Sequence, residues 1–297
     1  MVMQTEPDLL GVQHVDVDVC DRMEQSIDFR LQSRQSDLAW VDIKEGLTHW
    51  RIWLLLAYQD IKLRYRRSIL GPFWITLSMA ITVYSMGFLY GHLFRTDLNQ
   101  YYPFLVAGML AWAFISTVIT EQTEAFIGAE NYIKQIKLPY TLYIHRIVTK
   151  NIIIFFHNIL VMLPIYFIFH ESIKINFYTL LLIPGFLVLY FNAMTYGLIL
   201  AMTCARYRDV SQLVKSLIQI VFFLTPVMWS PAVLPPNKQF LISLNPFYSF
   251  LELIRAPLLG VAPTFFHLAI VLGATILGAF FAMRLFVPHR SRIVYWL

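Results

Sequence analysis

The 297-residue sequence contains few charged residues and only two cysteines, and both shortages exclude some classes of protein. Asp, Glu, Lys and Arg make up 14% of the chain, whereas about one quarter is usual in a soluble domain. Hydrophobic residues make up 58%. The two cysteines, Cys20 and Cys204, do not have the spacing of a zinc site. We therefore expect an integral membrane protein without a structural disulfide or zinc centre.

Several motifs of nucleotide-binding and catalytic sites are also missing. The sequence has no Gly-x-x-x-x-Gly-Lys-Ser/Thr phosphate loop, no Gly-x-Ser-x-Gly elbow, no His-Glu-x-x-His and no Rossmann glycine pattern. The sequence therefore predicts that this chain is not an enzyme, hydrolyses no ATP by itself and binds no metal or cofactor of its own.

Long uncharged runs are abundant, and a helix of about 20 such residues crosses a bilayer. They predict an all-α integral membrane protein with six transmembrane helices near residues 71–94, 102–127, 147–170, 178–204, 211–232 and 263–287. Between the last two runs the apolar pieces are too short to span, and prolines interrupt them. We expect two short re-entrant or interfacial helices there.

The N-terminal segment differs in composition from the rest. Residues 1–49 hold 10 of the 18 acidic residues and lack the basic start and apolar core of a signal peptide. We expect an acidic cytoplasmic tail, mostly mobile, with a helix near Met23–Trp40. Residues 50–67 follow with a tryptophan-containing apolar stripe and a basic end, a pattern typical of an amphipathic helix in the membrane interface. The stripe comprises Trp50, Trp53, Leu54, Ala57 and Ile61.

The positions of the basic residues predict the orientation. If the N-terminus is inside, 19 of the 23 Lys and Arg lie on the cytoplasmic side and four outside. Basic residues sort to the cytoplasmic side of membranes, so both termini are predicted to be cytoplasmic.

Ionisable residues are rare within the predicted spans. Glu121 and Glu124 lie near the inner end of the second span, and His157 lies within the third. We favour paired or solvated glutamates over a proton or substrate site, and an interhelical hydrogen bond over a ligand role for His157.

Aromatic residues occur inside the spans as well as at their ends. Aromatic faces stack on the apolar faces of sugars, so an aromatic-lined passage would suit a glycan, although each ring alone also fits helix packing. The channel-lining candidates are Tyr84, Trp112, Tyr190 and Tyr196. Gly87 and Gly91 form a Gly-x-x-x-Gly pair that permits close helix approach.

Four segments in order resemble a known family. They are "YQDIKLRYRRSILGPFW" (58–74), "AENYIKQIKLPYTLYIHR" (129–146), "ARYRDVSQLVKSLIQIVFFLTPVMW" (205–229) and "LNPFYSFLELIRAPLLG" (244–260). Together they resemble the permease subunits of type-2 ABC exporters for lipid-linked polysaccharide, the O-antigen, teichoic acid and capsule export family. The resemblance covers residues 47–288. The chain departs from many relatives in "WITLSMA", which lacks a proline, and in its longer acidic tail.

The resemblance implies a homodimer in the bacterial inner membrane that moves undecaprenyl-linked polysaccharide. Two copies of a separate nucleotide-binding ABC ATPase would hold the ATP and Mg²⁺ and drive transport. The implied organisation is a tail (1–49), an interface helix (50–67), a six-span permease domain (68–288) with a re-entrant hairpin (233–262), and a cytoplasmic C-terminus (289–297).

The resemblance also assigns site residues. Those implied to couple to the ATPase are Lys134, Ile136, Lys137, Leu138, Pro139, Arg206, Tyr207, Arg208 and Asp209. Those at a lipid-headgroup entrance, where guanidinium groups suit phosphate oxygens, are Lys62, Arg64, Arg66 and Arg67. Those of a periplasmic gate are Pro226, Trp229, Pro235, Pro236, Asn245, Pro246 and Phe247. Anchoring of the chain at the membrane is the alternative interpretation of the basic entrance cluster.

Two other functions remain open at this point. A type-2 ABC permease for a drug or small lipid would need the same partner and a narrower site. A stand-alone acyl- or glycosyltransferase would need clustered acids or bases at the interface, and Glu121 with Glu124 is the one candidate cluster. A nucleic-acid role for "KLRYRR" is disfavoured because the cluster adjoins a membrane span.

Overall fold

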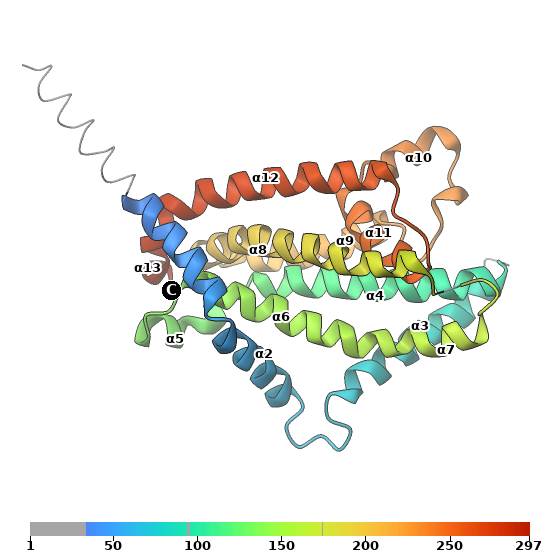
Figure 1. Ribbon diagram of the computed structural model, residues 1–297, viewed down its shortest axis with the longest axis horizontal. Coiled ribbons are helices and arrows are strands. Elements are labelled where there is room, and N and C mark those ends of the chain that lie inside the picture. Colours follow the sequence, from blue (N-terminus) through green and yellow to red (C-terminus); the bar gives the residue numbers. More distant parts are fainter. Residues whose placement is uncertain (1–33, 94–95, 174) are drawn as a thin grey trace, which may run out of the picture.

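The computed structural model describes residues 34–93, 96–173 and 175–297, and within these ranges every regular element is a helix (Figure 1). A helix over residues 34–48 precedes the labelled helices. The labelled helices are α2 (Trp50–Arg64), α3 (Phe73–Leu93), α4 (Leu98–Gln122), α5 (Glu130–Gln135), α6 (Tyr140–Asn158), α7 (Met162–Ile168), α8 (Leu182–Arg206), α9 (Asp209–Leu224), α10 (Pro236–Ser243), α11 (Pro246–Leu258), α12 (Phe265–His289) and α13 (Ile293–Trp296).

Five helical stretches in the described ranges are long and apolar enough to cross a membrane. They are Phe73–Leu93, Leu98–Gln122, Tyr140–Ile168, Phe177–Arg206 and Phe265–Trp296. Each matches one of the predicted spans, so the chain is a multi-pass membrane protein. The third begins earlier than expected, at Tyr140 instead of residue 147.

The predicted span over residues 211–232 is not a continuous helix, and six spans are therefore not confirmed. Helix α9 has 16 residues, about 24 Å at 1.5 Å per residue, against a hydrocarbon core of about 30 Å. It ends at Leu224 because Thr225, which precedes Pro226, is extended. The apolar residues beyond Pro226 continue the hydrophobic run but not the helix.

Two short helices, α10 and α11, follow this break as expected, and their re-entrant or interfacial position stays a prediction. Helix α11 packs against α4, α8 and α12, and most of its second half is buried. Gly185 on α8 permits this contact, because a Cβ there would lie 2.9 Å from the Leu253 carbonyl oxygen.

Helix α4 forms the centre of the bundle. In its most apolar 18-residue window 61% of residues are buried, against 11% for α3 and 22% for the last span. The outer helices therefore present their remaining apolar side chains to the surroundings, as membrane helices do. Helix α3 approaches α4 at Gly87 and Gly91, where added Cβ atoms would lie 2.4 Å from the Tyr102 ring and 2.3 Å from Leu98. The predicted role of the glycine pair is confirmed.

The segment before α3 packs on the bundle more than the sequence suggests. Ala57 and Ile61 of the predicted apolar stripe are buried on the side of α2 that packs against α6, while Trp50 and Leu54 are exposed. In the preceding helix, Ala39 and Asp42 have no exposed surface. The rest of the predicted tail, including Cys20 and most of the helix expected near Met23–Trp40, lies outside the described residues.

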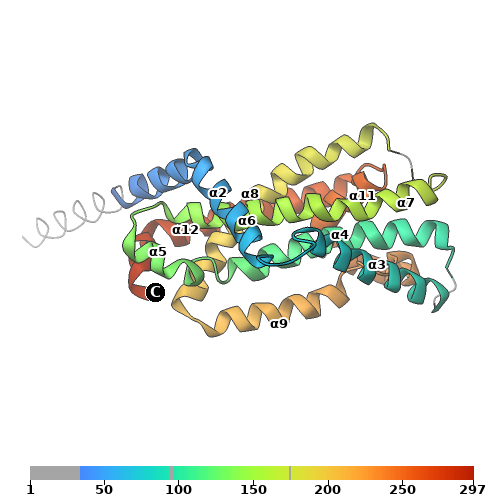
Figure 2. The same ribbon diagram turned by 90° about the horizontal axis from the view of Figure 1, so that it is seen from below.

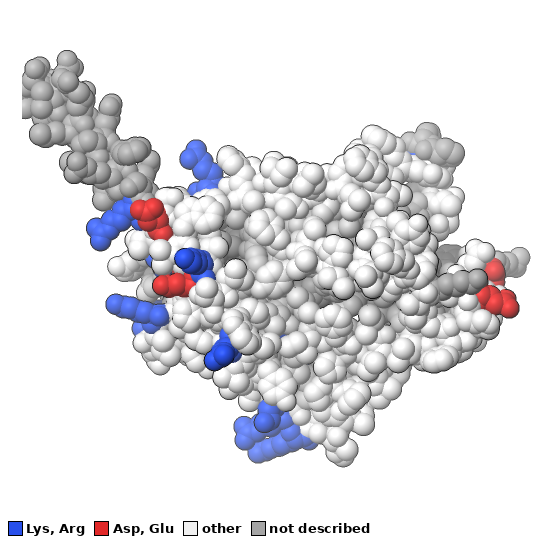
Figure 3. Space-filling view, in the orientation of Figure 1, with Lys and Arg blue, Asp and Glu red and all other residues white. Residues whose placement is uncertain are grey.

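Charge is distributed unevenly along the bundle. Figure 3 shows most Lys and Arg side chains at the end where α5 and α13 lie and around the lower edge next to it. We call this end the basic end, and the opposite end, which carries α10, the far end (Figure 1).

Candidate transport groove and charged end

A groove of about 610 Å³ lies between α4 and α9 and combines polar and aromatic side chains. Its lining residues are Trp112, Ser116, Thr117, Thr120, Lys215, Ile218, Gln219, Phe222 and Phe223. Thr120 donates a hydrogen bond to the Ser116 carbonyl oxygen at 2.9 Å, so its hydroxyl is satisfied by its own helix. The polar wall is therefore tolerated beside apolar helices and still presents oxygen atoms to the groove.

Aromatic rings form the other part of this wall. The Trp112 ring centre lies 5.6 Å from that of Phe222 and 6.3 Å from that of Phe247. Figure 2 shows α9 and α3 on the same side of α4. Trp112 is the one predicted channel candidate that lines the groove.

The three predicted tyrosines pack between helices. Tyr84 donates to the Val161 carbonyl oxygen at 2.6 Å, Tyr196 donates to that of Ala274 at 2.8 Å, and Tyr190 bonds to the His145 ring. Their hydroxyls serve helix contacts, and none of the three lines the groove. The channel-lining role of these three tyrosines stays a prediction.

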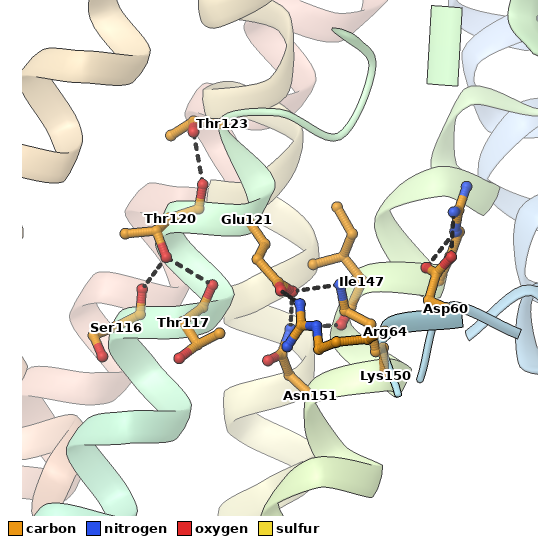
Figure 4. Close-up of polar contacts among 11 residues, drawn as sticks. Asp60, Arg64, Ser116, Thr117, Thr120, Glu121, Thr123, Ile147, Lys150 and Asn151 are labelled. Atoms are coloured by element: carbon orange, nitrogen blue, oxygen red, sulfur yellow. Dashed lines mark hydrogen bonds and ion pairs between the residues drawn. The ribbon is translucent and has the colours of Figure 1, made fainter. Parts of the chain in front are cut away.

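Glu121 is the centre of a polar network between α2, α4 and α6, shown in Figure 4. Its Oε1 accepts from Arg64 at 3.0 Å, and its Oε2 lies 2.9 Å from Lys150 Nζ and accepts from Asn151 at 2.6 Å. Its side chain is 19% exposed and that of Lys150 is 11% exposed. The prediction that Glu121 is paired is confirmed.

Glu124 and His157 have simpler contacts. Glu124 forms an ion pair with Lys215 of α9 at the basic end of the groove. The His157 ring bonds to the Ile153 carbonyl oxygen of its own helix at 2.8 Å, so the interhelical bond predicted for this side chain is not formed. The His157 carbonyl oxygen instead accepts from Thr76 of α3 at 3.0 Å.

The predicted entrance residues, Lys62, Arg64, Arg66 and Arg67, differ in their contacts. All four are exposed, and Arg64, whose side chain is 46% exposed, is the one with an ion pair to Glu121. Arg67 has a φ of 69° in the turn that follows α2. Nearby, Arg146 of α6 makes a two-pronged ion pair with Asp60 of α2 at 2.7 and 2.5 Å, which fixes α2 against α6.

The predicted coupling segment around α5 is largely exposed. Lys134, Ile136 and Lys137 are exposed, Leu138 is half-buried and Pro139 is buried. Lys134 pairs with Glu130 at 2.7 Å, and this hydrogen bond and charge hold the pKa of Glu130 below its usual value. Beneath them, buried Ile133 anchors α5 to the core.

The second predicted coupling segment lies at the same end. Arg206, Tyr207, Arg208 and Asp209 are all exposed. The Arg206 guanidinium lies 5.0 Å from the Tyr207 ring centre and 5.6 Å from that of Trp296. The charge of Arg208 adds to the lowering of the Glu130 pKa, so the two segments are close enough to interact electrostatically.

Comparison with known proteins assigns the family. Residues 51–259 match the family model described as "ABC-2 type transporter", which is more than half of the chain. The chain belongs to the ABC-2 type transporter family. Chains of this family are the membrane-embedded subunits of transporters, as the multi-pass architecture indicates.

Individual relatives of this ABC-2 chain are permeases named for O-antigen export. The chain is 21% identical over 207 residues to the O-antigen export system permease protein RfbA of Klebsiella pneumoniae, covering 67% of this chain and 76% of that protein. It is 21% identical over 216 residues to the protein of the same name from Myxococcus xanthus, covering 72% and 82%.

Towards the far end of this ABC-2 chain, one of the residues predicted to form a gate, Pro226, contacts a buried arginine. Arg255 on α11 is 1% exposed and donates to the Pro226 carbonyl oxygen at 2.7 Å, while Glu252 forms its ion pair. Asn245 caps α11 at Phe247 and also donates to Thr225 at 3.1 Å. The break after α9 is thus bonded to α11.

The remaining predicted gate residues are less enclosed. Trp229 is half-buried, Pro235 and Pro246 are exposed, and Pro236 begins α10. Arg255 is one of the four basic residues predicted to lie outside, and the sequence predicts no further role for it.

The groove residues of this ABC-2 chain were also missed. The predicted second span includes three hydroxyl-bearing residues that recur on one side of a helix, Ser116, Thr117 and Thr120. Gln219 belongs to a similar polar stripe on α9, with Gln212, Lys215 and Ser216. This periodicity is the signal that would have indicated them.

Proposed function

We propose that this chain is the membrane subunit of an ATP-driven exporter that moves undecaprenyl-linked polysaccharide across the bacterial inner membrane. The groove between α4 and α9 carries the proposal, because it offers hydroxyl and amide groups beside aromatic faces. Glycans hydrogen-bond through their hydroxyls and stack through their apolar ring faces. The similarity to two permeases named for O-antigen export supports the same substrate class.

The functional unit in this proposal is a homodimer with its basic ends in the cytoplasm. A groove along one side of α4 is half of a passage, and a second copy facing it would enclose the other half. Helix α3, which has the fewest buried residues of the five spans, lies on the same side and is available for that contact. The concentration of Lys and Arg at one end supports the orientation.

A nucleotide-binding ABC ATPase, in two copies, would dock on the basic end and hold the ATP and Mg²⁺. The exposed side chains of Lys134, Ile136 and Lys137 form the principal contact, supported by the loop 206–209. Pro139 is buried and would shape this surface from below. Movement of the surface on ATP binding would be passed to α6, which begins directly after it.

The lipid headgroup would approach through the exposed basic residues beside α2. Lys62, Arg66 and Arg67 are free of the Glu121 network and suit a pyrophosphate group. Arg64 serves the structure instead, through its ion pair with Glu121. At the far end, the segment from Pro226 to α11 would open to release the glycan, with the Arg255 contact holding it shut.

The two alternative functions have less support. A small-molecule exporter would share the family, but the relatives above are named for O-antigen export. A membrane transferase would need a free acid or base, whereas Glu121 and Glu124 are both ion-paired. The described residues contain no group of His, Cys, Asp and Glu that would hold a metal ion.

The proposal is tested in cells that lack this chain and receive plasmid-borne variants. Cells without it are expected to accumulate lipid-linked glycan on the cytoplasmic face and lose it from the surface. Thr120→Val with Gln219→Leu removes one hydroxyl from the α4 wall and the amide from the α9 wall at nearly constant volume, and surface glycan is expected to fall at least tenfold. The measurement is surface glycan labelling at matched membrane levels of the protein.

Gln212→Leu is the matched control, because Gln212 is exposed on α9 and does not line the groove. It should support normal export. Normal surface glycan in cells without the chain would refute the glycan substrate. An equal loss of export in the Gln212 variant and the groove variant would refute the role of the groove.

A further inference from the structure

The N-terminus of α6 is not capped by its own neighbouring residues. Its cap position is Pro139, which has no side-chain acceptor, and no capping bond is formed from that position. The first backbone N–H groups of a helix have no partner within the helix and carry the positive end of its dipole. An acceptor from elsewhere in the chain is therefore needed.

Asp42 supplies this acceptor from 98 positions earlier in the sequence. Its Oδ2 accepts from the Tyr140 backbone N–H at 3.1 Å, and its Oδ1 accepts from the Thr141 N–H at 3.1 Å and hydroxyl at 2.9 Å. The side chain is fully buried. A buried carboxylate with this many donors is a fixed point of the structure.

Asp42 also connects the C-terminal segment to the same point. Arg290, at the end of α12, donates from Nε to Asp42 Oδ2 at 2.9 Å. The Arg290 guanidinium lies 5.5 Å from the Tyr140 ring centre. Three segments distant in sequence, the helix over residues 34–48, the start of α6 and the end of α12, therefore meet at one carboxylate.

The helix that carries Asp42 is shaped for this contact. Ala39 is buried in the same apolar cluster as Ile133 of α5 and Leu142 of α6. Gly46 permits close approach, since a Cβ there would lie 2.0 Å from Thr141 Oγ1. The contact thus depends on a small residue and a carboxylate one turn apart on the same helix.

We propose that Asp42 is a positioning residue that fixes the path from the coupling surface into α6. Residues 136–139 connect that surface to α6, and the carboxylate holds the first turn of α6 where they end. Loss of this contact would let the surface move without moving α6. ATP hydrolysis would then continue while less glycan is transported per ATP. The coupling role rests on the proposed function above.

The test uses the full-length chain purified with its partner ATPase and two independent variants. Asp42→Asn keeps the shape but turns an amide N–H₂ toward donors, and Gly46→Ala blocks the approach sterically. Asp37→Asn, exposed on the same helix, is the matched control. Amide hydrogen exchange of peptides covering residues 136–142 reports on the contact with Asp42. The ratio of ATP hydrolysed to glycan exported measures the coupling of hydrolysis to transport.

Both variants are expected to raise the rate of amide exchange in residues 136–142 at least tenfold and the ratio of ATP hydrolysed to glycan exported at least threefold. Asp37→Asn should change neither quantity. Faster exchange with an unchanged ratio, or a parallel fall of hydrolysis and export, would overturn the coupling role. Unchanged exchange would overturn the contact. Wild-type protein that purifies without an ATPase would refute the proposed function and the coupling role with it, while the exchange result would still decide the contact.

Discussion

At the scale of single residues, the two glutamates at the inner end of α4 have different environments. Glu121 is mostly buried and satisfies Arg64, Lys150 and Asn151 together. Glu124 is 55% exposed and pairs with Lys215, itself 38% exposed. Exposed ion pairs contribute little because water screens them, whereas removing one partner of a buried pair leaves an uncompensated charge.

This difference predicts unequal effects of the same substitution. Glu121→Gln should lower the free energy of unfolding by about 3 kcal/mol, because Lys150 remains buried without its counter-charge. Glu124→Gln should change it by less than about 1 kcal/mol. Thermal unfolding of both purified variants in one detergent gives the comparison, and equal shifts would show that the network does not stabilise the bundle.

At the scale of helices, the contact of α3 with α4 depends on the absence of side chains. A Cβ at Gly87 would lie 2.4 Å from the Tyr102 ring, whereas one at Gly273 on α12 would meet nothing within 4 Å. Replacing each of these two glycines with alanine therefore distinguishes the effect of packing on stability from the effect of helix propensity.

We expect Gly87→Ala to destabilise the protein by about 1–3 kcal/mol, because the Tyr102 ring must move. Gly273→Ala should be neutral or slightly stabilising, since alanine is the better helix former. The measurement is the midpoint temperature of unfolding, taken from the loss of the monodisperse peak when heated samples of each variant are run on size-exclusion chromatography. A destabilised Gly273 variant beside an unaffected Gly87 variant would contradict the described packing.

At the scale of the whole molecule, the proposed homodimer depends on which side of the subunit carries the groove. The groove is lined by α4 and α9 only, and α3 flanks the same side. Helix α12 lies away from this side and exposes apolar side chains such as Ile276 and Phe280. A dimer that encloses the groove would bring together α9 of each copy and leave both α12 helices in lipid.

Cysteine crosslinking in membranes distinguishes these faces. In a background with Cys20→Ser and Cys204→Ala, Gln219→Cys should give crosslinked dimers with a flexible bifunctional maleimide. Ile276→Cys, on the exposed face of α12, should stay monomeric under the same conditions. Dimers formed only by the Ile276 variant would place the second subunit against α12 and would contradict a passage shared between the two grooves.

The sequence alone determined the class of this protein and much of its architecture. The long uncharged runs predicted five spans that the structure contains, and the glycine pair predicted a close helix contact of the first span, because both depend on local composition and spacing. The ordered motifs indicated the family, which the match over residues 51–259 confirms. These features are encoded within short segments and need no knowledge of which segments meet.

Only the tertiary structure decided how the polar groups are used. The same apolar run that predicted a fifth span is cut by Pro226, and its end is held by Arg255 from α11. The hydroxyl groups of Tyr84 and Tyr196 donate to backbone carbonyl oxygens of other helices, a use that their residue type alone does not indicate. Asp42 caps a helix that begins 98 residues later. Partners so distant in sequence are fixed by the packing of helices, since a buried polar group must be paired and only the fold determines which partner is within reach.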